Sequence, residues 1–354
     1  MLLTLLTSLI LGLQNLHEQG FRGEGITIAV IDCGFYKANN PDYIRQDKIL
    51  HVYDLLKQDS INRPDIFSDP NNTHGANCLS IIAADLPNFT GTAPDANFII
   101  IRTEDFSYEY YGEVERVAKG MLIADSLGAD ILTISLGYAT FDGGINDFTY
   151  ADMTGKANIA SRTATELARR GKLVCIAAGN YGDGAWHYIT CPSDADSILA
   201  VGACRSDSTH ASFSGYGPTA DGRIKPDVSA WGEDTHYLNL NTGEVRTGRG
   251  TSYACPEIAG LAACLWQALP DKTAMQIRDL IIRSSHQYNH PDNLLGYGIP
   301  NAYRAYLMGK DDSTDYHGST QSASENTQKM LRHGQMYIVR DGIWYTLLGT
   351  KLQQ

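Results

Sequence analysis

Residues 248–266 read Gly-Arg-Gly-Thr-Ser-Tyr-Ala-Cys-Pro-Glu-Ile-Ala-Gly-Leu-Ala-Ala-Cys-Leu-Trp, a glycine-rich turn that runs directly into a helix. Ser252 lies at the junction. From Ala254 onward nearly every residue is small or apolar, so this helix is expected at the centre of a large domain. Pro256 is expected in the first helical turn, where its missing N–H breaks no hydrogen bond. Ser252 is then either a simple N-cap or, beside free backbone N–H groups, a site for developing negative charge.

Apolar runs typical of buried parallel strands alternate with helical patterns along the chain. The first run, Ile26 to Ile31, brings Asp32 to the carboxyl end of a strand, where α/β sheets place their sites. Such alternation predicts an α/β fold, a three-layer doubly wound parallel sheet with helices on both faces. Further strands are predicted at 98–101, 131–135, 173–177 and 197–201, and helices at 13–20, 113–127 and 157–170.

Length and composition exclude several classes of function. A chain of 354 residues can bury the core of one large domain. Its net charge of −12 argues against nucleic acid as a partner, because phosphate binding needs a basic surface. Seven cysteines show none of the C-x-x-C spacings of zinc or redox sites and are expected to be buried free thiols.

The two ends of the chain differ in composition from the middle. Residues 1–13 are an apolar run, interpreted as the core of a signal peptide or as a first helix of the fold, and too short to span a membrane. Residues 309–329 are almost entirely polar, which predicts a linker after a main domain at 14–308. In the tail at 330–354, Asp341-Gly342 predicts a small β-hairpin, similar to the sorting tails of some secreted bacterial proteins.

Three segments carry the groups that nucleophilic catalysis needs. A serine hydroxyl needs a base, and the base needs an orienting carboxylate. The chain offers Asp32 in Val-Ile-Asp-Cys-Gly, His74 in Thr-His-Gly and Ser252 in Gly-Thr-Ser-Tyr-Ala-Cys-Pro. Alone, each could be a turn former or a helix cap, but together they resemble, in the same chain order, the signatures of the subtilisin-like serine peptidases, the subtilases.

The resemblance extends over about residues 13–307 and implies the subtilisin-like fold. It further implies a serine endopeptidase that hydrolyses peptide bonds through an acyl-enzyme, with Asp32 orienting His74 and His74 activating Ser252. Asn180, in Ala-Ala-Gly-Asn, would complete the oxyanion hole together with the Ser252 N–H. The positions that match the family's substrate-binding segments, which pair with an extended peptide and shape its specificity pocket, are Ser135, Leu136, Gly137, Ala178, Gly179 and Thr190.

The sequence also departs from the family pattern. Cys33, Ala76 and Glu257 stand where the family usually has other residues, and Cys78 resembles the free cysteine beneath the histidine of proteinase K-like members. A cysteine nucleophile is an alternative, but Ser252 has the better setting. The segment 83–91 is shorter than the family's strongest calcium loop, so calcium is possible but no site for it is identified, and no cofactor is expected to be required.

The resemblance implies protein or peptide substrates, and the chain is expected to be a monomer in a secreted, periplasmic or cell-surface location. Two alternatives remain open. The protein could be a catalytically silent relative that binds peptides along Ser135 to Gly137. It could also be a transpeptidase or cyclase, which transfers the same acyl-enzyme to an amine instead of water.

Overall fold

The computed structural model describes residues 11–56, 60–61, 64–105, 107–318, 327–332, 335–340 and 343–346. The chain divides into two compact units, residues 1–307 and residues 308–354, and each is described by itself.

The larger unit is built on one sheet with the strand order β10-β9-β8-β7-β1-β6-β2-β3. All neighbouring strands in it are parallel, except that β3 at one edge runs antiparallel to β2. The strands are β1 (Thr27–Asp32), β2 (Ile49–Asp54), β3 (Ser60–Ile61), β6 (Asn97–Arg102), β7 (Ile131–Ile134), β8 (Leu173–Ala177), β9 (Leu199–Cys204) and β10 (Val228–Trp231). The predicted parallel sheet is confirmed.

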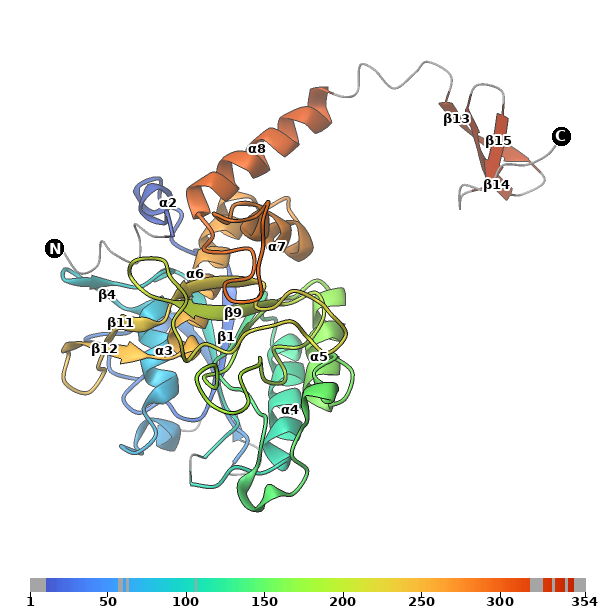
Figure 1. The fold of residues 1–354 in the computed structure, drawn as a ribbon. Helices are drawn as coiled ribbons and strands as arrows, with labels where there is room; N and C mark the ends of the chain where they lie inside the picture. Colours follow the sequence, from blue (N-terminus) through green and yellow to red (C-terminus); the bar gives the residue numbers. More distant parts are fainter. Residues whose placement is uncertain are drawn as a thin grey trace. The chain divides into compact units, whose positions relative to one another are not determined.

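Helices cover both faces of this sheet (Figure 1), which confirms the three-layer architecture. The helices α4 (Gly112–Ser126) and α5 (Ile159–Arg169) pack against each other on one face, over a core formed by inward residues of β1, β6, β7 and β8. On the other face lie α3 (His74–Ala83) and α6 (Thr251–Ala268). Fifteen residues of α6, from Thr251 to Leu265, are buried, as its apolar sequence predicts.

Several elements were not predicted because their sequences lack a clear period. β2 alternates only partly between buried and exposed residues, and β11 (Glu233–Leu238) pairs with β12 (Val245–Arg249) in a largely exposed antiparallel hairpin. The short strands β3 and β10 were also not predicted, nor were β4 (Asp85–Leu86), β5 (Phe89–Thr90) and the 3₁₀ helices Gln46–Lys48, Pro64–Phe67, Asp142–Gly144 and Tyr150–Asp152. The helix α7 (Ala274–Arg283) was missed although its buried residues have helical spacing.

The start of the fold lies before the boundary predicted at residue 13. Leu11 and Leu13 are fully buried, and the Leu11 carbonyl accepts a hydrogen bond of 2.7 Å from the Ala302 N–H. The helix α2 (Gln14–Glu18) follows. Residues 11–13 therefore belong to the folded unit, whereas the rest of the proposed signal segment, residues 1–10, lies outside the described residues.

The predicted polar linker is in part regular structure. The helix α8 (Ala302–Gly318) continues into it, because extending a helix that has already formed costs little even where the residues are polar. In the smaller unit, β14 (Gln335–Arg340) and β15 (Ile343–Thr346) form the predicted antiparallel pair. A third strand, β13 (Thr327–Arg332), pairs with β14 and was not predicted.

Candidate active site

Asp32 is the last residue of β1 and is fully buried. Its Oδ1 accepts hydrogen bonds from the Cys33 backbone N–H at 2.8 Å and from Cys33 Sγ at 3.1 Å. The same oxygen lies 2.7 Å from Nδ1 of His74. Since a carboxylate oxygen accepts hydrogen bonds, this contact fixes the imidazole with its proton on Nδ1, which makes Nε2 the basic nitrogen of the ring.

His74 is the first residue of α3 and reaches Asp32 because Gly75 follows it. A Cβ on Gly75 would lie 2.7 Å from the Asp32 Cβ and 2.7 Å from the Gly34 carbonyl oxygen. Only glycine therefore allows the helix start to approach the end of β1 this closely. The His-Gly pair noticed in the sequence thus has a steric cause.

Ser252 is the second residue of α6, and its position depends on Gly250, whose φ of 153° suits glycine. A Cβ on Gly250 would lie 2.8 Å from Ser252 Oγ and 3.5 Å from Asn180 Nδ2. The serine hydroxyl and the asparagine amide nitrogen therefore face the same space, which a side chain at residue 250 would fill.

The structure corrects the prediction for Pro256, which lies inside α6 and not in its first turn. Proline has no N–H, so the carbonyl of Ser252, four residues earlier, loses its helical hydrogen bond. Two side chains satisfy that carbonyl instead, Ser135 Oγ at 2.9 Å and Cys78 Sγ at 3.3 Å. Because Pro256 leaves the Ser252 carbonyl without its helical donor, this carbonyl bonds to Ser135, just after β7, and to Cys78 in α3.

Asn180 follows β8, and its amide is oriented by Thr251. The Oδ1 atom accepts hydrogen bonds from the Thr251 N–H at 2.8 Å and from Thr251 Oγ1 at 3.0 Å. Because two donors engage the amide oxygen, the amide NH₂ is the end left to face Ser252. That is the orientation an oxyanion-hole donor requires.

Burial lowers the pKa of the His74 imidazole, but the Asp32 carboxylate and the neighbouring Cys78 and Cys33 side chains together outweigh this effect, so the pKa lies well above its ordinary value of 6.5. The Tyr253 ring packs edge-on against the imidazole, with 6.0 Å between ring centroids. Cys78 Sγ lies 3.9 Å from His74 Nδ1, and burial raises the pKa of this thiol. A neutral, buried thiol is a poor nucleophile, which favours Ser252 over Cys78.

A cavity of about 200 Å³ brings most of the predicted site residues together. His74, Ser252 and Asn180 line it, with Asp32 behind His74. The residues that line it are His74, Glu104, Glu109, Ser135, Leu136, Gly137, Ala177, Gly179, Asn180, Tyr181, Thr251 and Ser252.

Two predicted substrate-binding residues do not reach this cavity. Ala178 and Thr190 are both fully buried, and the Thr190 N–H donates to the Ala178 carbonyl at 3.0 Å. A Cβ on Gly137 would lie 2.2 Å from Thr190 Oγ1, and one on Gly179 would lie 2.8 Å from it. Thr190 therefore packs against the backbone of Gly137 and Gly179 and does not line the cavity.

Sequence reasoning missed Glu104, Glu109, Ala177 and Thr251 as lining residues. Thr251 adjoins Ser252, so its place in the motif could have indicated it. Glu104 follows the apolar run of β6 as Asp32 follows that of β1, and the carboxyl ends of neighbouring parallel strands meet at one edge of the sheet. Glu109 lies in a segment without a period, and no sequence signal marks it.

All seven cysteines are buried free thiols, as predicted. Within the part of the chain that the structure describes, one group of three residues could hold a metal ion, and it is Asp32, His74 and Cys78 themselves.

Two further segments singled out in the sequence have structural roles. The short segment after α3 forms the β4–β5 hairpin. The Lys225-Pro226-Asp227 motif is structural, because buried Asp227 pairs with Lys225 at 2.5 Å and with Arg278 at 2.8 Å.

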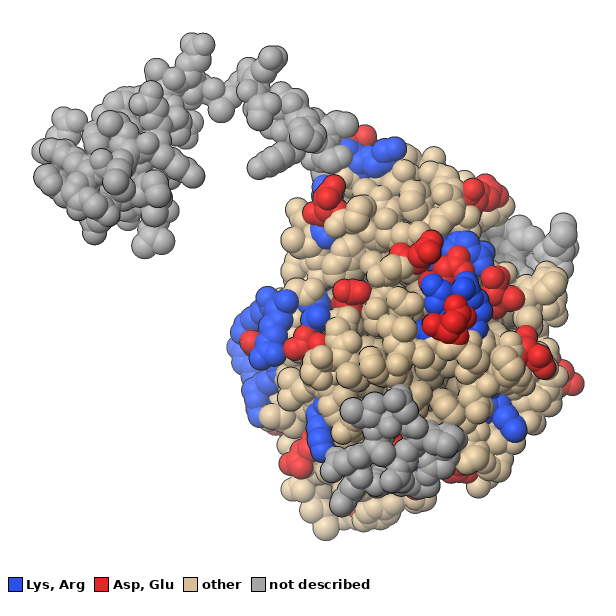
Figure 2. Space-filling view, turned by 180° about the vertical axis from the view of Figure 1, so that it is seen from behind, with Lys and Arg blue, Asp and Glu red and all other residues tan. Residues whose placement is uncertain are grey.

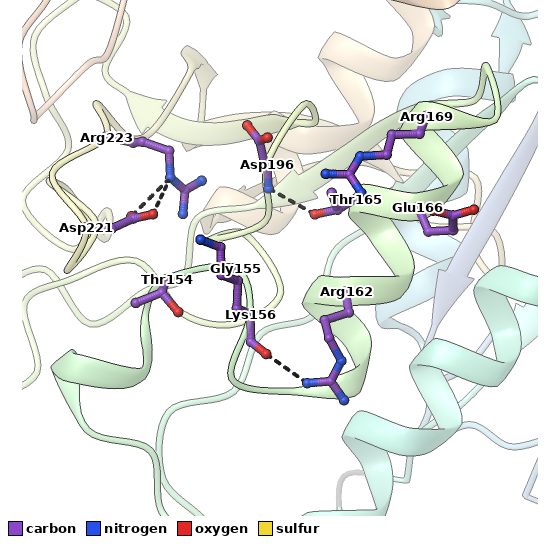
Figure 3. A pocket seen from close by; sticks show the side chains of 10 residues that line it. All are labelled: Thr154, Gly155, Lys156, Arg162, Thr165, Glu166, Arg169, Asp196, Asp221 and Arg223. Carbon is purple, nitrogen blue, oxygen red and sulfur yellow. Dashed lines mark hydrogen bonds and ion pairs between the residues drawn. The ribbon is translucent and has the colours of Figure 1, made fainter.

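A larger cavity of about 580 Å³ lies beside α5 (Figure 3) and shares no lining residue with the first. Its charged groups are mixed in sign and in part mutually paired: Arg223 binds Asp221 at 3.0 Å, and Arg162 donates to the Lys156 carbonyl at 2.8 Å. Its lining contains neither a histidine nor a serine or cysteine. It therefore lacks the nucleophile and base of the first cavity.

A parallel α/β sheet that holds a carboxylate–imidazole pair and a serine at one edge defines the class of serine hydrolases. The comparisons with known proteins narrow this class. The model of the subtilase family, Peptidase S8, matches residues 23–298, and the chain belongs to this family of serine peptidases. The resemblance inferred from the sequence is confirmed.

The chain is 29% identical to thermitase from Thermoactinomyces vulgaris, over 80% of this chain and 89% of that protein. It is 30% identical to subtilisin Savinase from Lederbergia lenta, over 82% of this chain and 93% of the relative. Among solved structures, MycP1 without its N-terminal propeptide matches with a TM-score of 0.66 and 22% identity, over 85% of this chain and 96% of that chain. The prenylagaramide maturation protease PagA matches with a TM-score of 0.64 and 22% identity, over 84% of this chain and 98% of that chain.

Proposed function

We propose that this peptidase is an endopeptidase whose catalytic groups are Asp32, His74 and Ser252. The observation that carries the proposal is the contact of 2.7 Å between His74 Nδ1 and buried Asp32, at a cavity that His74 and Ser252 both line. His74 Nε2 takes the proton of the Ser252 hydroxyl as Oγ attacks the substrate carbonyl carbon. Asp32 holds His74 in the tautomer with its proton on Nδ1 and stabilises the imidazolium that forms when Nε2 takes the serine proton.

The oxygen of the tetrahedral intermediate is held by Asn180 Nδ2 and the Ser252 N–H. The intermediate collapses when His74 returns the proton to the leaving amine, which breaks the peptide bond and leaves the acyl group on Ser252 Oγ. Water then attacks the acyl-enzyme, with His74 again as the base. The chain itself supplies nucleophile, base and oxyanion donors, so we propose that no cofactor is required.

An extended peptide would pair its backbone with Ser135–Gly137 and with Gly179, which lie on the cavity wall. Such pairing favours peptides over small esters, because it uses the backbone groups that only a peptide has. The surface agrees with a protein or peptide substrate: on the face in Figure 2, basic side chains lie in small groups beside acidic ones, without the continuous basic surface that nucleic acid needs.

The structure contains, in the part described, no helix long and apolar enough to cross a membrane. We propose that the chain acts as a monomer, in a secreted, periplasmic or cell-surface location. Gel filtration and cell fractionation test these two statements independently of activity.

Labelling of the whole chain with a fluorophosphonate probe tests the mechanism. The expected result is a single adduct on Ser252 by peptide mapping and none in Ser252→Ala. If the folded protein takes no label, the site is that of a catalytically silent relative. Digestion of a peptide in the presence of an added amine then separates hydrolysis from transpeptidation, because only a transpeptidase or cyclase gives products with the mass of the amine adduct.

A further inference from the structure

One wall of the active-site cavity carries a carboxylate that the mechanism does not use. Glu104 lies two residues beyond β6 and is only 7% exposed. It lines the same cavity as His74 and Ser252. Its Oε1 atom is buried and, among the described residues, has no hydrogen-bond partner. A buried carboxylate oxygen without a donor is costly, so it marks a place where a ligand can supply one.

The surrounding charges do not neutralise Glu104. Arg116 is the cation that acts electrostatically on Glu104, but its guanidinium is already engaged. It donates to Glu113 Oε1 at 3.1 Å and to the Thr103 carbonyl at 2.7 Å. Glu109 adds a second carboxylate to the cavity wall. Of the described residues that line the cavity, none is a lysine or an arginine. The wall around Glu104 therefore carries two carboxyl groups, and no lysine or arginine of the cavity lining pairs with them.

Burial raises the pKa of Glu104 well above its ordinary range, and the carboxylates of Glu113 and Glu109 raise it further. Burial likewise raises the pKa of Glu109. A cation placed between the two would favour their ionised forms and recover the interaction energy that the empty cavity lacks.

We propose that Glu104, assisted by Glu109, forms a subsite that selects a lysine or arginine side chain of the substrate, on the acyl side of the scissile bond. This inference rests on the proposed endopeptidase function, in which the resemblance to the family's substrate-binding segment implies that the acyl side of the peptide lies along Ser135–Gly137. In the strand order β7-β1-β6, Ser135 follows β7 and Glu104 lies beyond β6, so the two segments flank Asp32 from opposite sides. Both segments line the same cavity, so a peptide along the first segment can place a side chain against the second.

A long cationic side chain fits this wall better than a metal ion. Calcium takes six to eight oxygen ligands, whereas the cavity wall supplies two carboxylates. Lysine and arginine carry their charge at the end of an apolar stem, and the stem can pack beside Leu136 while the charged end meets Glu104. Arginine can also bind both oxygens of one carboxylate.

The test uses the whole chain and sets of fluorogenic peptides that differ at one position among the four before the scissile bond. Each set carries arginine, lysine, the neutral isostere norleucine, or glutamate. At one position, kcat/KM for arginine or lysine is expected to exceed that for norleucine by about tenfold or more, with glutamate the poorest. Equal kcat/KM for arginine and norleucine at all four positions overturns the proposal.

Glu104→Gln keeps the side-chain shape and removes the charge, so it should bring the arginine and norleucine peptides to similar kcat/KM. Glu115→Gln, an exposed glutamate on α4, is the matched control and should keep the preference. A preference that survives Glu104→Gln overturns the assignment to this residue.

Two readouts separate this inference from the proposed function. Fluorophosphonate labelling reports whether Ser252 is reactive, whatever the peptide. Fluorescence anisotropy with Ser252→Ala reports whether the cavity binds the arginine peptide more tightly than the norleucine peptide, whatever the catalysis. If Ser252 is labelled but the peptides show no charge preference, the peptidase proposal stands and the subsite is refuted. If the arginine peptide binds more tightly but Ser252 is not labelled, the subsite stands and the peptidase proposal is refuted.

Discussion

At the scale of single residues, the site depends on groups that hold one another in a definite orientation. The Asn180 amide is a clear case, because its oxygen accepts two hydrogen bonds from Thr251. A sequence pattern can suggest that an asparagine belongs to the site. It cannot say which end of the amide faces the substrate, since that depends on a threonine 71 residues away.

The orientation of Asn180 leads to a kinetic prediction. Asn180→Asp keeps the oxygen that binds Thr251 but removes the donor, so kcat should fall about 100- to 1,000-fold, the effect known for loss of one such donor in subtilisin, while KM changes little. Steady-state kinetics on one peptide measures both. A matched Thr251→Ser variant, which keeps the hydroxyl, should retain most of the activity. An unchanged kcat in Asn180→Asp would remove the asparagine from the oxyanion hole.

The raised pKa of His74 leads to a second prediction. The base acts only when neutral, so kcat/KM should rise with pH through an apparent pKa above 6.5, the ordinary value for histidine. In Ser252→Ala, NMR titration of the imidazole should give the same raised value. Adding Asp32→Asn should lower it, because burial then acts without the opposing carboxylate. An imidazole pKa that is unaffected by Asp32→Asn would contradict the electrostatic account.

At the scale of elements, α6 carries two features that its apolar pattern does not reveal. One is Pro256, whose place inside the helix leaves the Ser252 carbonyl to Ser135 and Cys78. The pattern correctly predicts a buried helix and a serine at its start. It does not place Pro256 beyond the first turn, because the donors that replace its N–H, Ser135 just after β7 and Cys78 in α3, are remote in sequence.

The role of Pro256 predicts that it is energetically coupled to Ser135. Ser135→Ala should destabilise the protein by about 1–3 kcal/mol, since it removes one donor from the buried Ser252 carbonyl. In a Pro256→Ala background the new N–H can bond that carbonyl, so the same Ser135→Ala change should cost less. Urea denaturation of the wild type, the two single variants and the double variant gives the coupling free energy between the two positions. Additive effects would mean that the proline and the serine act independently.

The second feature of α6 is Glu257, which is fully buried. Its Oε2 accepts from the Trp231 N–H at 3.2 Å, and burial raises the pKa of the carboxyl well above its ordinary range. The folded protein then holds this proton more tightly than the unfolded chain does. Stability is accordingly lost as pH rises from the unfolded pKa of about 4.3 through the raised folded pKa.

We therefore expect Glu257→Gln, which does not titrate, to have a higher Tm than the wild type at pH 8. The difference should shrink toward pH 4, where the wild-type carboxyl is protonated in both states. Calorimetry across this range measures it, and the exposed Glu115→Gln serves as the control that should show no such trend. A Tm difference that is constant with pH would mean that Glu257 is not held protonated by the fold.

At the scale of the whole molecule, the sequence predicts the central strands, the helices α2, α4, α5 and α6, and the edge where the site lies. Those strands are buried on both faces, so their apolar runs are continuous. It does not predict β2 or the β11–β12 hairpin, which are partly exposed. It leaves open whether the residues before 14 belong to the fold, as buried Leu11 and Leu13 do, and it treats residues 309–318 as linker, because composition does not reveal packing or helix continuation.

The division of the chain leads to a last prediction, for removal of residues 319–354. The buried core runs from Leu11 to Tyr306, and the unit of residues 1–307 is compact by itself, so the shortened chain should keep its Tm and its rate of fluorophosphonate labelling. If the tail serves sorting, its removal should change only where the protein is found, which fractionation of expressing cells with an antibody detects. A lower Tm or slower labelling would instead show that residues beyond 318 stabilise the catalytic unit. The sorting hypothesis would then lose its basis, because a stabilising role would explain the presence of the tail.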